Sequence, residues 1–121
     1  MAESHDLGKK GEDIAAEYLK KSGYKILFRN WKWGKNEIDI IAEKDDIVVF
    51  VEVKTRTDEF LAGVSAAVSV EKQRSIIWAA EGYIKKFYVD KESRFDIITI
   101  IISGNTQNID HIENAYYPTL R

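Results

Sequence analysis

Hydrophobic and polar positions along the chain follow two different periods, and these divide it into seven expected elements. Between residues 6 and about 22, apolar and small residues recur at helical spacing, and Gly23 follows as a typical residue after a helix end. A second helical stretch follows Ser69, which has the chemistry of an N-cap, and extends to about Phe87. The pattern therefore predicts two helices.

Five further stretches are rich in β-favouring residues and predict strands: 24–30, 37–43, 47–55, 94–102 and a short strand near 109–112. Between them lie a loop at "WKWGKN", turns at "KDD" and "SGNTQN", and a loop of functional length at 56–68. The resulting order, α-β-β-β-α-β-β, predicts one α/β domain with a central mixed sheet flanked by helices.

Composition and charge narrow the class of protein. With 121 residues and 45% hydrophobic content, the chain has the size of one domain, and without cysteine it has neither disulfides nor a cysteine-based zinc site. The polar start and the lack of an apolar run of roughly 18 residues lead us to expect a cytoplasmic protein without a membrane span. A net charge of -2 means that any contact with nucleic acid must be local.

The predicted hairpin at 37–55 carries charges inside an apolar pattern. Its second arm is apolar on both faces before the ending "EVK", and charges in such a strand must be paired, metal-bound or at the open end of the sheet. If the hairpin closes symmetrically about the "KDD" turn, Asp39 lies opposite Glu52, and Glu37 lies opposite Lys54. A bulge or a longer turn would shift this register by one residue.

Two acids in direct opposition destabilise a sheet. Either one of Asp39 and Glu52 takes up a proton, or a hard divalent cation such as Mg²⁺ lies between them. In the alternative interpretation, Glu37 and Lys54 form a cross-strand ion pair while the other two acids are exposed at a solvated strand end. A further acid, Glu12, lies at the border of the first helix's apolar stripe and either joins this site or extends to water.

Five blocks, in order along the chain, resemble the YraN-like family of small bacterial proteins. They are "GKKGEDIAAEYLKKSGYKILFRNWKW" from Gly8, "EIDIIA" from Glu37, "FVEVKTR" from Phe50, "KQR" from Lys72 and "RFD" from Arg94. That family is placed in the PD-(D/E)XK nuclease superfamily and is similar to archaeal Holliday-junction resolvases. The resemblance implies a restriction-endonuclease-like fold. One departure is Asn36, where the family usually has glycine; asparagine tolerates positive φ, so the turn is expected to survive.

The resemblance also implies an active site. Asp39, Glu52 and Lys54 would be catalytic, and Asp39 and Glu52 together with Glu12 would hold Mg²⁺, for which Mn²⁺ would substitute. Lys54 would orient or deprotonate the attacking water, or place its charge against the developing oxyanion, and the sequence leaves these roles open. The expected nucleic-acid contacts are Arg56 on the same strand face and Lys72, Gln73 and Arg74 at the start of the second helix. The sequence assigns no role to Glu37 or Asp96.

These inferences predict a Mg²⁺-dependent endonuclease that acts on structured or branched DNA. By analogy with resolvases we also expect a homodimer, because symmetric cutting of two strands needs two sites. Two alternatives stay open: a nucleic-acid-binding module with the same fold that does not cleave, which the acidic pI of 5.7 mildly favours, and a partner protein whose hairpin charges form ion pairs.

Overall fold

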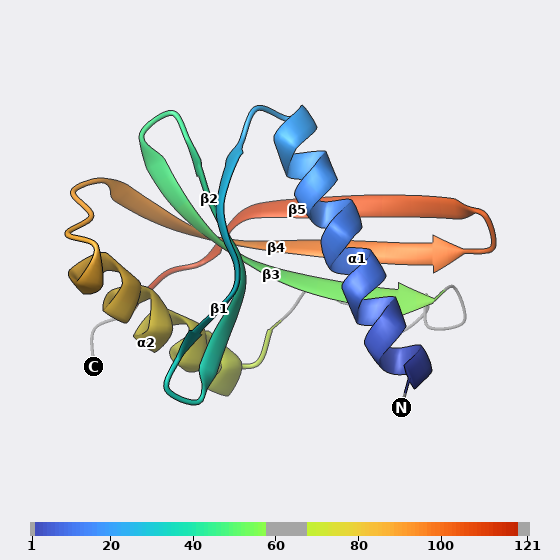
Figure 1. The fold of residues 1–121 in the computed structure, drawn as a ribbon, viewed down its shortest axis with the longest axis horizontal. Coiled ribbons are helices and arrows are strands. Elements are labelled where there is room, and N and C mark those ends of the chain that lie inside the picture. The colour runs from blue at the N-terminus through green and yellow to red at the C-terminus, as the bar shows by residue number, and fades with distance from the viewer. Residues whose placement is uncertain (1, 58–67, 119–121) are drawn as a thin grey trace.

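The computed structural model describes residues 2–57 and 68–118, and it has the predicted order of elements (Figure 1). These elements are α1 (Ala2–Lys21), β1 (Lys25–Trp33), β2 (Asn36–Lys44), β3 (Ile47–Thr57), α2 (Val70–Lys86), β4 (Glu92–Ser103) and β5 (Thr106–Tyr116). Most of the loop predicted at 56–68 lies outside the described residues, although its first two residues belong to β3. Among the described helices, none is long and apolar enough to cross a bilayer.

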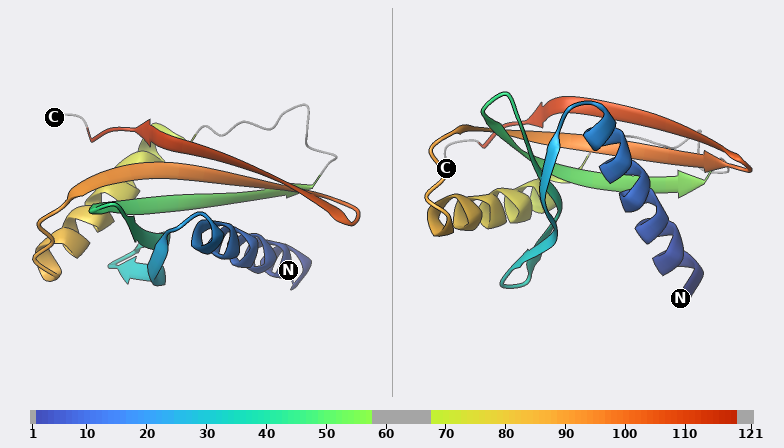
Figure 2. Two further views of the ribbon diagram at one scale, coloured as in Figure 1. Left: turned by 90° about the horizontal axis from the view of Figure 1, so that it is seen from above. Right: turned by 45° about the horizontal axis from the view of Figure 1, so that its top comes forward.

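The five strands form one mixed sheet in the order β1-β2-β3-β4-β5. β3 and β4 pair in parallel, with α2 in the connection between them, and all other neighbouring strands are antiparallel. Figures 1 and 2 show α1 lying across β3, β4 and β5, while the β1–β2 ribbon twists away from their direction. The predicted mixed sheet flanked by two helices is confirmed.

The two faces of the sheet support separate hydrophobic cores, as the apolar pattern of β3 requires. Val48 and Phe50 belong to the core beneath α2, whereas Val49 and Val51 belong to the core beneath α1. All four side chains are at most 2% exposed. Because successive side chains of a strand point to opposite faces, a central strand covered by a helix on each side has no apolar position to leave in water.

The prediction of a loop at "WKWGKN" is wrong. β1 continues to Trp33, and only Gly34 and Lys35 separate it from β2. Trp31 and Trp33 stack with ring centroids 5.6 Å apart and pack against the α2 core. Gly82 of α2 leaves the necessary space, because a Cβ there would lie 2.3 Å from the Trp33 ring. Aromatic packing on the helix thus extends the strand beyond the length that its sequence suggested.

The turn before β2 survives as expected, but not through a positive φ at Asn36. Asn36 is the first residue of β2 and pairs with Trp33, and it is not among the residues with positive φ. The left-handed position of this turn is instead Gly34, with φ of 62°. At the C-terminal end, β5 is longer than the short strand predicted near 109–112, since it pairs with β4 along most of its length.

Candidate functional site

The predicted register of the β2–β3 hairpin is confirmed, but its ladder ends early. Pairing runs from Lys44–Ile47 to Ile40–Val51, in the register that places the turn at Asp45 and Asp46. Beyond that last pair β2 stays with β1 and β3 stays with β4, so the two strands diverge as a fork.

Asp39 and Glu52 are the first residues after the last ladder pair, one on each arm of the fork. The Val53 N–H donates to Asp39 Oδ2 over 2.8 Å, so the acid accepts a backbone donor from the diverging strand. The acids are therefore not the formal ladder pair that symmetry predicted. They still interact, since each affects the pKa of the other.

Both carboxyl groups are difficult to ionise in this position. Burial, and then the charge of Glu52, raises the pKa of Asp39 to about 7, although the Val53 N–H opposes the shift. Burial likewise raises the pKa of Glu52, against the charge of Lys72 and a side-chain hydrogen bond with Asp39. Two close acids that are shielded from water share protons as a pair. At neutral pH the pair therefore stays partly protonated unless a cation compensates its negative charge.

One oxygen of this pair lacks a hydrogen-bond partner. Glu52 Oε1 is buried and has no such partner among the described residues. The hydroxyl of Tyr116 on β5 is also buried without one, and burial followed by the charges of Glu52 and Asp96 raises the pKa of this phenol. An unpartnered buried carboxylate oxygen is costly. This oxygen-rich position has the chemistry that a hard divalent cation requires.

Basic residues lie around Glu52. Lys72 Nζ, from the first turn of α2, is 3.8 Å from Glu52 Oε2. Burial, and then the neighbouring charge of Arg56, lowers the pKa of Lys54. A hollow of about 360 Å³ is lined by Glu52, Val53, Lys54, Arg56, Val68, Ser69 and Lys72. The structure thus gathers Glu52, the predicted lysine and two of the predicted nucleic-acid contacts around one hollow, and Asp39 interacts with Glu52 and with the Val53 N–H.

The two other predicted nucleic-acid contacts do not line this hollow. Gln73 Nε2 donates to the Val68 carbonyl over 2.9 Å, next to the N-cap interaction in which Ser69 Oγ accepts from the Lys72 N–H. Arg74 is exposed on α2. Gln73 therefore helps to fix the start of the helix that carries Lys72, while Arg74 remains available at the surface.

Glu12 reaches the edge of the site because α1 packs very closely on β3. A Cβ on Gly11 would lie 1.8 Å from Thr55 Oγ1, whereas Gly8 has no neighbour within 4 Å of such an atom. The close approach of α1 to β3 therefore depends on the missing side chain of Gly11 and not on that of Gly8. After burial and nearer groups, the charge of Glu12 contributes to the raised pKa of both Asp39 and Glu52.

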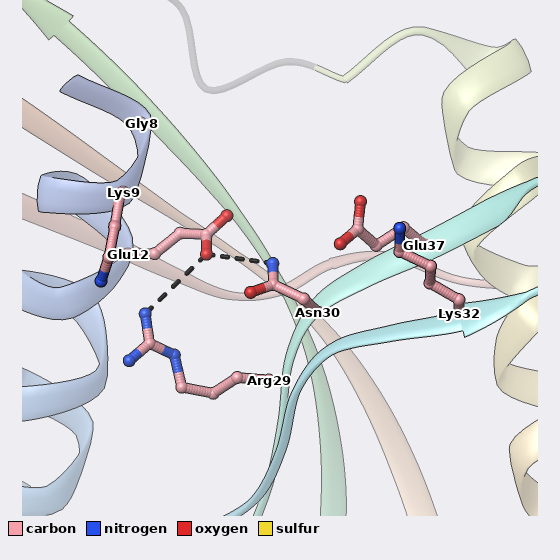
Figure 3. Close-up of a pocket in the computed structure, with 7 residues that line it drawn as sticks. All are labelled: Gly8, Lys9, Glu12, Arg29, Asn30, Lys32 and Glu37. Carbon is pink, nitrogen blue, oxygen red and sulfur yellow. Dashed lines mark hydrogen bonds and ion pairs between the residues drawn. The ribbon is translucent and has the colours of Figure 1, made fainter. Parts of the chain in front are cut away.

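The carboxylate of Glu12 faces a second hollow of about 720 Å³ between α1 and the β1–β2 ribbon (Figure 3). Asn30 Nδ2 donates to Glu12 Oε1 over 3.0 Å, and the Arg29 guanidinium lies 3.8 Å from the same oxygen. Glu37 lines the far side of the hollow. Within residues 2–57 and 68–118 no three potential ligands are already grouped as a metal site.

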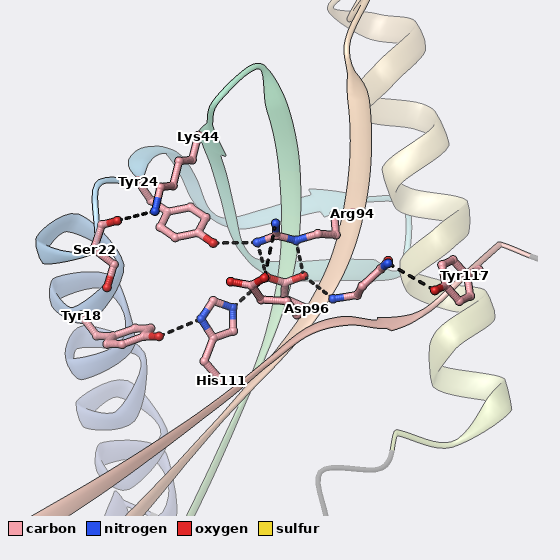
Figure 4. Close-up of polar contacts among 10 residues, drawn as sticks. Tyr18, Ser22, Tyr24, Lys44, Arg94, Asp96, His111 and Tyr117 are labelled. Carbon is pink, nitrogen blue, oxygen red and sulfur yellow. Dashed lines mark hydrogen bonds and ion pairs between the residues drawn. The ribbon is translucent and has the colours of Figure 1, made fainter.

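A separate polar network is buried beneath the C-terminal half of α1 (Figure 4). Asp96 is fully buried; it accepts two hydrogen bonds of 2.9 Å from Arg94, one of 2.7 Å from His111 and one from the Asn114 backbone. Burial raises the pKa of Asp96, but these hydrogen bonds together outweigh it and hold the pKa below its usual value. Tyr18 of α1 contacts the other ring nitrogen of His111 at 2.9 Å. The network therefore ties α1 to β4 and β5.

Sequence reasoning missed this network, Tyr116 and Asn30. It gave His111 no role because no other histidine or cysteine lies near it in the sequence. The signal for Asp96 was available, since a single acid within the apolar run "RFDIITIII" must find a partner. Tyr116 and Asn30 carried no comparable signal, because their importance depends on strands that meet only in the folded sheet.

Comparison of the chain with known proteins finds one matching family model and several similar bacterial proteins. The family model described as "Uncharacterised protein family UPF0102" matches residues 11–100. A UPF0102 protein of Parabacteroides distasonis is 46% identical over 121 residues, which cover 100% of both chains. Another from Bacteroides thetaiotaomicron is 46% identical over 120 residues, or 99% of each chain. A third, from Flavobacterium johnsoniae, is 44% identical over 121 residues, covering 97% of this chain and 98% of the relative.

Proposed function

Since the chain belongs to the uncharacterised protein family UPF0102, we propose that it is a Mg²⁺-dependent endonuclease of the PD-(D/E)XK superfamily, which cleaves structured or branched DNA. The sheet with a helix on each face is compatible with the restriction-endonuclease-like fold of that superfamily. The preference for branched DNA rests on the resemblance to resolvases. The proposed metal-dependent cleavage is based on the two acids at the fork.

The observation that carries this proposal is the pair of acids at the fork. Asp39 and Glu52 interact in a position where burial raises the pKa of both, and one oxygen of Glu52 is buried without a hydrogen-bond partner. The contact of Asp39 with the Val53 N–H is structural, but it needs only an acceptor and does not explain a second acid beside it. These residues fit Mg²⁺, with Asp39 and Glu52 as ligands and Glu12 as a third acid, directly or through water. When bound, Mg²⁺ supplies Lewis-acid stabilisation of phosphate charge and a more acidic water.

The basic residues then have separable tasks. Lys54 has a lowered pKa, which suits an amine that accepts a proton from the attacking water or holds that water in place. Lys72 and Arg56 line the hollow beside the acids, where they would contact the phosphates that flank the scissile bond. Lys72 Nζ lies 3.8 Å from Glu52 Oε2. Lys72 would therefore move away from Glu52 when it contacts a phosphate.

A non-cleaving nucleic-acid-binding module with the same fold is the second candidate. It is favoured by Glu12, whose carboxylate is occupied by Asn30 and lies near Arg29, and by the absence of three grouped ligands within the described residues. In this candidate, Lys72 would serve as a permanent counter-charge to Glu52. A resolvase-like activity would in addition require a homodimer, which sedimentation analysis of the free and DNA-bound protein would detect.

The deciding experiment incubates the purified protein with labelled four-way junction, flap, single-stranded and duplex DNA, in Mg²⁺, Mn²⁺ or EDTA. We expect cleavage that requires the metal and that falls about 10²–10⁴-fold in Lys54→Met. Asp39→Asn and Glu52→Gln should abolish it. Lys25→Met, on an exposed residue at the far end of β1, is the matched control and should cleave normally.

Each other outcome selects a different conclusion. Metal-independent DNA binding without cleavage would favour the binding module. Cleavage that survives Asp39→Asn and Lys54→Met would leave a nuclease but reject this active site. A protein that neither binds nor cleaves any of these DNA substrates would reject both candidate functions.

A further inference from the structure

Asn30 has an unusual backbone conformation within β1. Its φ is 52°, although the neighbouring pairs Arg29–Ile40 and Trp31–Ile38 keep the β1–β2 ladder in register. These pairs lie on either side of Asn30 and so place it opposite Asp39. Asparagine is one of the few residues other than glycine that enter this left-handed region readily. The local distortion therefore lies directly beside a proposed metal ligand.

The side chain of Asn30 connects this distorted position to α1. Its amide nitrogen donates to Glu12 Oε1 over 3.0 Å, and Figure 3 shows the amide between Glu12 and Glu37 at the wall of the larger hollow. The preceding residue, Arg29, donates to Asp13 over 2.8 Å. Two consecutive residues of β1 thus contact two consecutive acids of α1, and Arg29, Asn30 and Glu12 line the larger hollow.

We propose that Asn30 is a positioning residue that holds the Glu12 carboxylate towards the cation between Asp39 and Glu52. This inference rests on the proposed function, because it assumes that the acids bind a metal. From this left-handed position the amide donates to Glu12 Oε1, so the contact engages one of the two oxygens of that carboxylate. The amide is neutral, so it orients the acid without adding to the positive charge of Arg29, whose guanidinium lies 3.8 Å from the same oxygen.

Partners that orient a metal-binding carboxylate change metal affinity by about 10–100-fold when they are removed. The test measures the affinity of the metal-free protein for Mn²⁺ by calorimetry or by the electron paramagnetic resonance of free Mn²⁺. Asn30→Gly keeps access to positive φ and removes only the amide. We expect it to weaken Mn²⁺ binding about tenfold with little change in the thermal unfolding midpoint of the metal-free protein.

A double-mutant comparison separates positioning from a general structural effect. In a Glu12→Gln background, Asn30→Gly should cause no further loss of Mn²⁺ affinity, because the carboxylate that Asn30 orients is gone. Asn30→Ala should weaken Mn²⁺ binding as much as Asn30→Gly and should also lower the unfolding midpoint, because alanine is strained at this φ.

The outcomes distinguish this inference from the proposed function. If Asn30→Gly binds Mn²⁺ like the wild type while Asp39→Asn does not bind it, the metal site stands and the role of Asn30 is rejected. Additive losses from Asn30→Gly and Glu12→Gln would also reject it. If the wild type itself fails to bind Mn²⁺, the proposed metal-dependent function fails, and this inference fails with it.

Discussion

Replacing Asp39 with asparagine should make the metal-free protein more stable at alkaline pH. The folded protein holds a proton on this acid up to a pKa of about 7, whereas the ordinary value is 3.8. An acid with a raised pKa opposes folding once it must ionise, so its unfavourable effect grows as the pH rises from about 4 to 7 and is complete above that. Asparagine resembles the protonated acid, and its carbonyl can still accept the Val53 N–H.

The size of this effect follows from the two pKa values. The interval from 3.8 to about 7 corresponds to about 4 kcal/mol at about 1.36 kcal/mol per pH unit. Because Asp39 is only partly buried and shares its proton with Glu52, we expect roughly half of this, about 2 kcal/mol. With a urea dependence of about 2 kcal/mol per molar, the unfolding midpoint should rise by about 1 M.

The assay is urea unfolding followed by the fluorescence of the three tryptophans, at several values between pH 5 and pH 8 in EDTA. The gain from Asp39→Asn should be small at pH 5 and largest at pH 8. Mg²⁺ should stabilise the wild type and leave Asp39→Asn unchanged. Asp90→Asn, in an exposed position before β4, is the control and should change stability little at any pH. An equal gain at both pH values, or a loss at pH 8, would refute the reasoning.

Three further predictions use the same unfolding assay or DNA binding. Asp96→Asn should cost about 3 kcal/mol at neutral pH, because it leaves the partly buried guanidinium of Arg94 without its fully buried, ionised partner. Gly11→Ala should destabilise by about 1–3 kcal/mol through overlap with β3, while Gly8→Ala, which has open space, should be neutral or slightly stabilising. Lys72→Met should weaken DNA binding and reduce the slope of log affinity against log salt by about 1; an unchanged slope would exclude a phosphate contact.

The sequence predicted those parts of the fold that depend on local periodicity. The two helices, the five strands and the symmetric turn at Asp45 and Asp46 follow from patterns within a few neighbouring residues. It failed where packing between distant elements decides the outcome. β1 extends to Trp33 because Gly82, almost fifty residues later, leaves space for the indole, and no local pattern records that space.

The candidate site, like the fold, could be predicted from the sequence only in part. Alternation and turn symmetry were sufficient to bring Asp39 and Glu52 together, because both lie in one hairpin. They could not show that the ladder stops at Ile40 and Val51, since that divergence depends on pairing with β1 and β4. The positive φ of Asn30 is equally invisible in sequence, because asparagine occurs both in ordinary strand conformations and in the left-handed region.

Backbone pairing between β2 and β3 ends at Ile40 and Val51, so neither acid takes part in that ladder. Nothing in the architecture requires negative charge at these two positions, and neutral side chains of the same size would ease folding. On the proposed function, a descendant of this protein that no longer used a cation would be free to lose both acids and keep every strand. On the proposed function, these two acids serve the cation that they bind and not the folding of the chain.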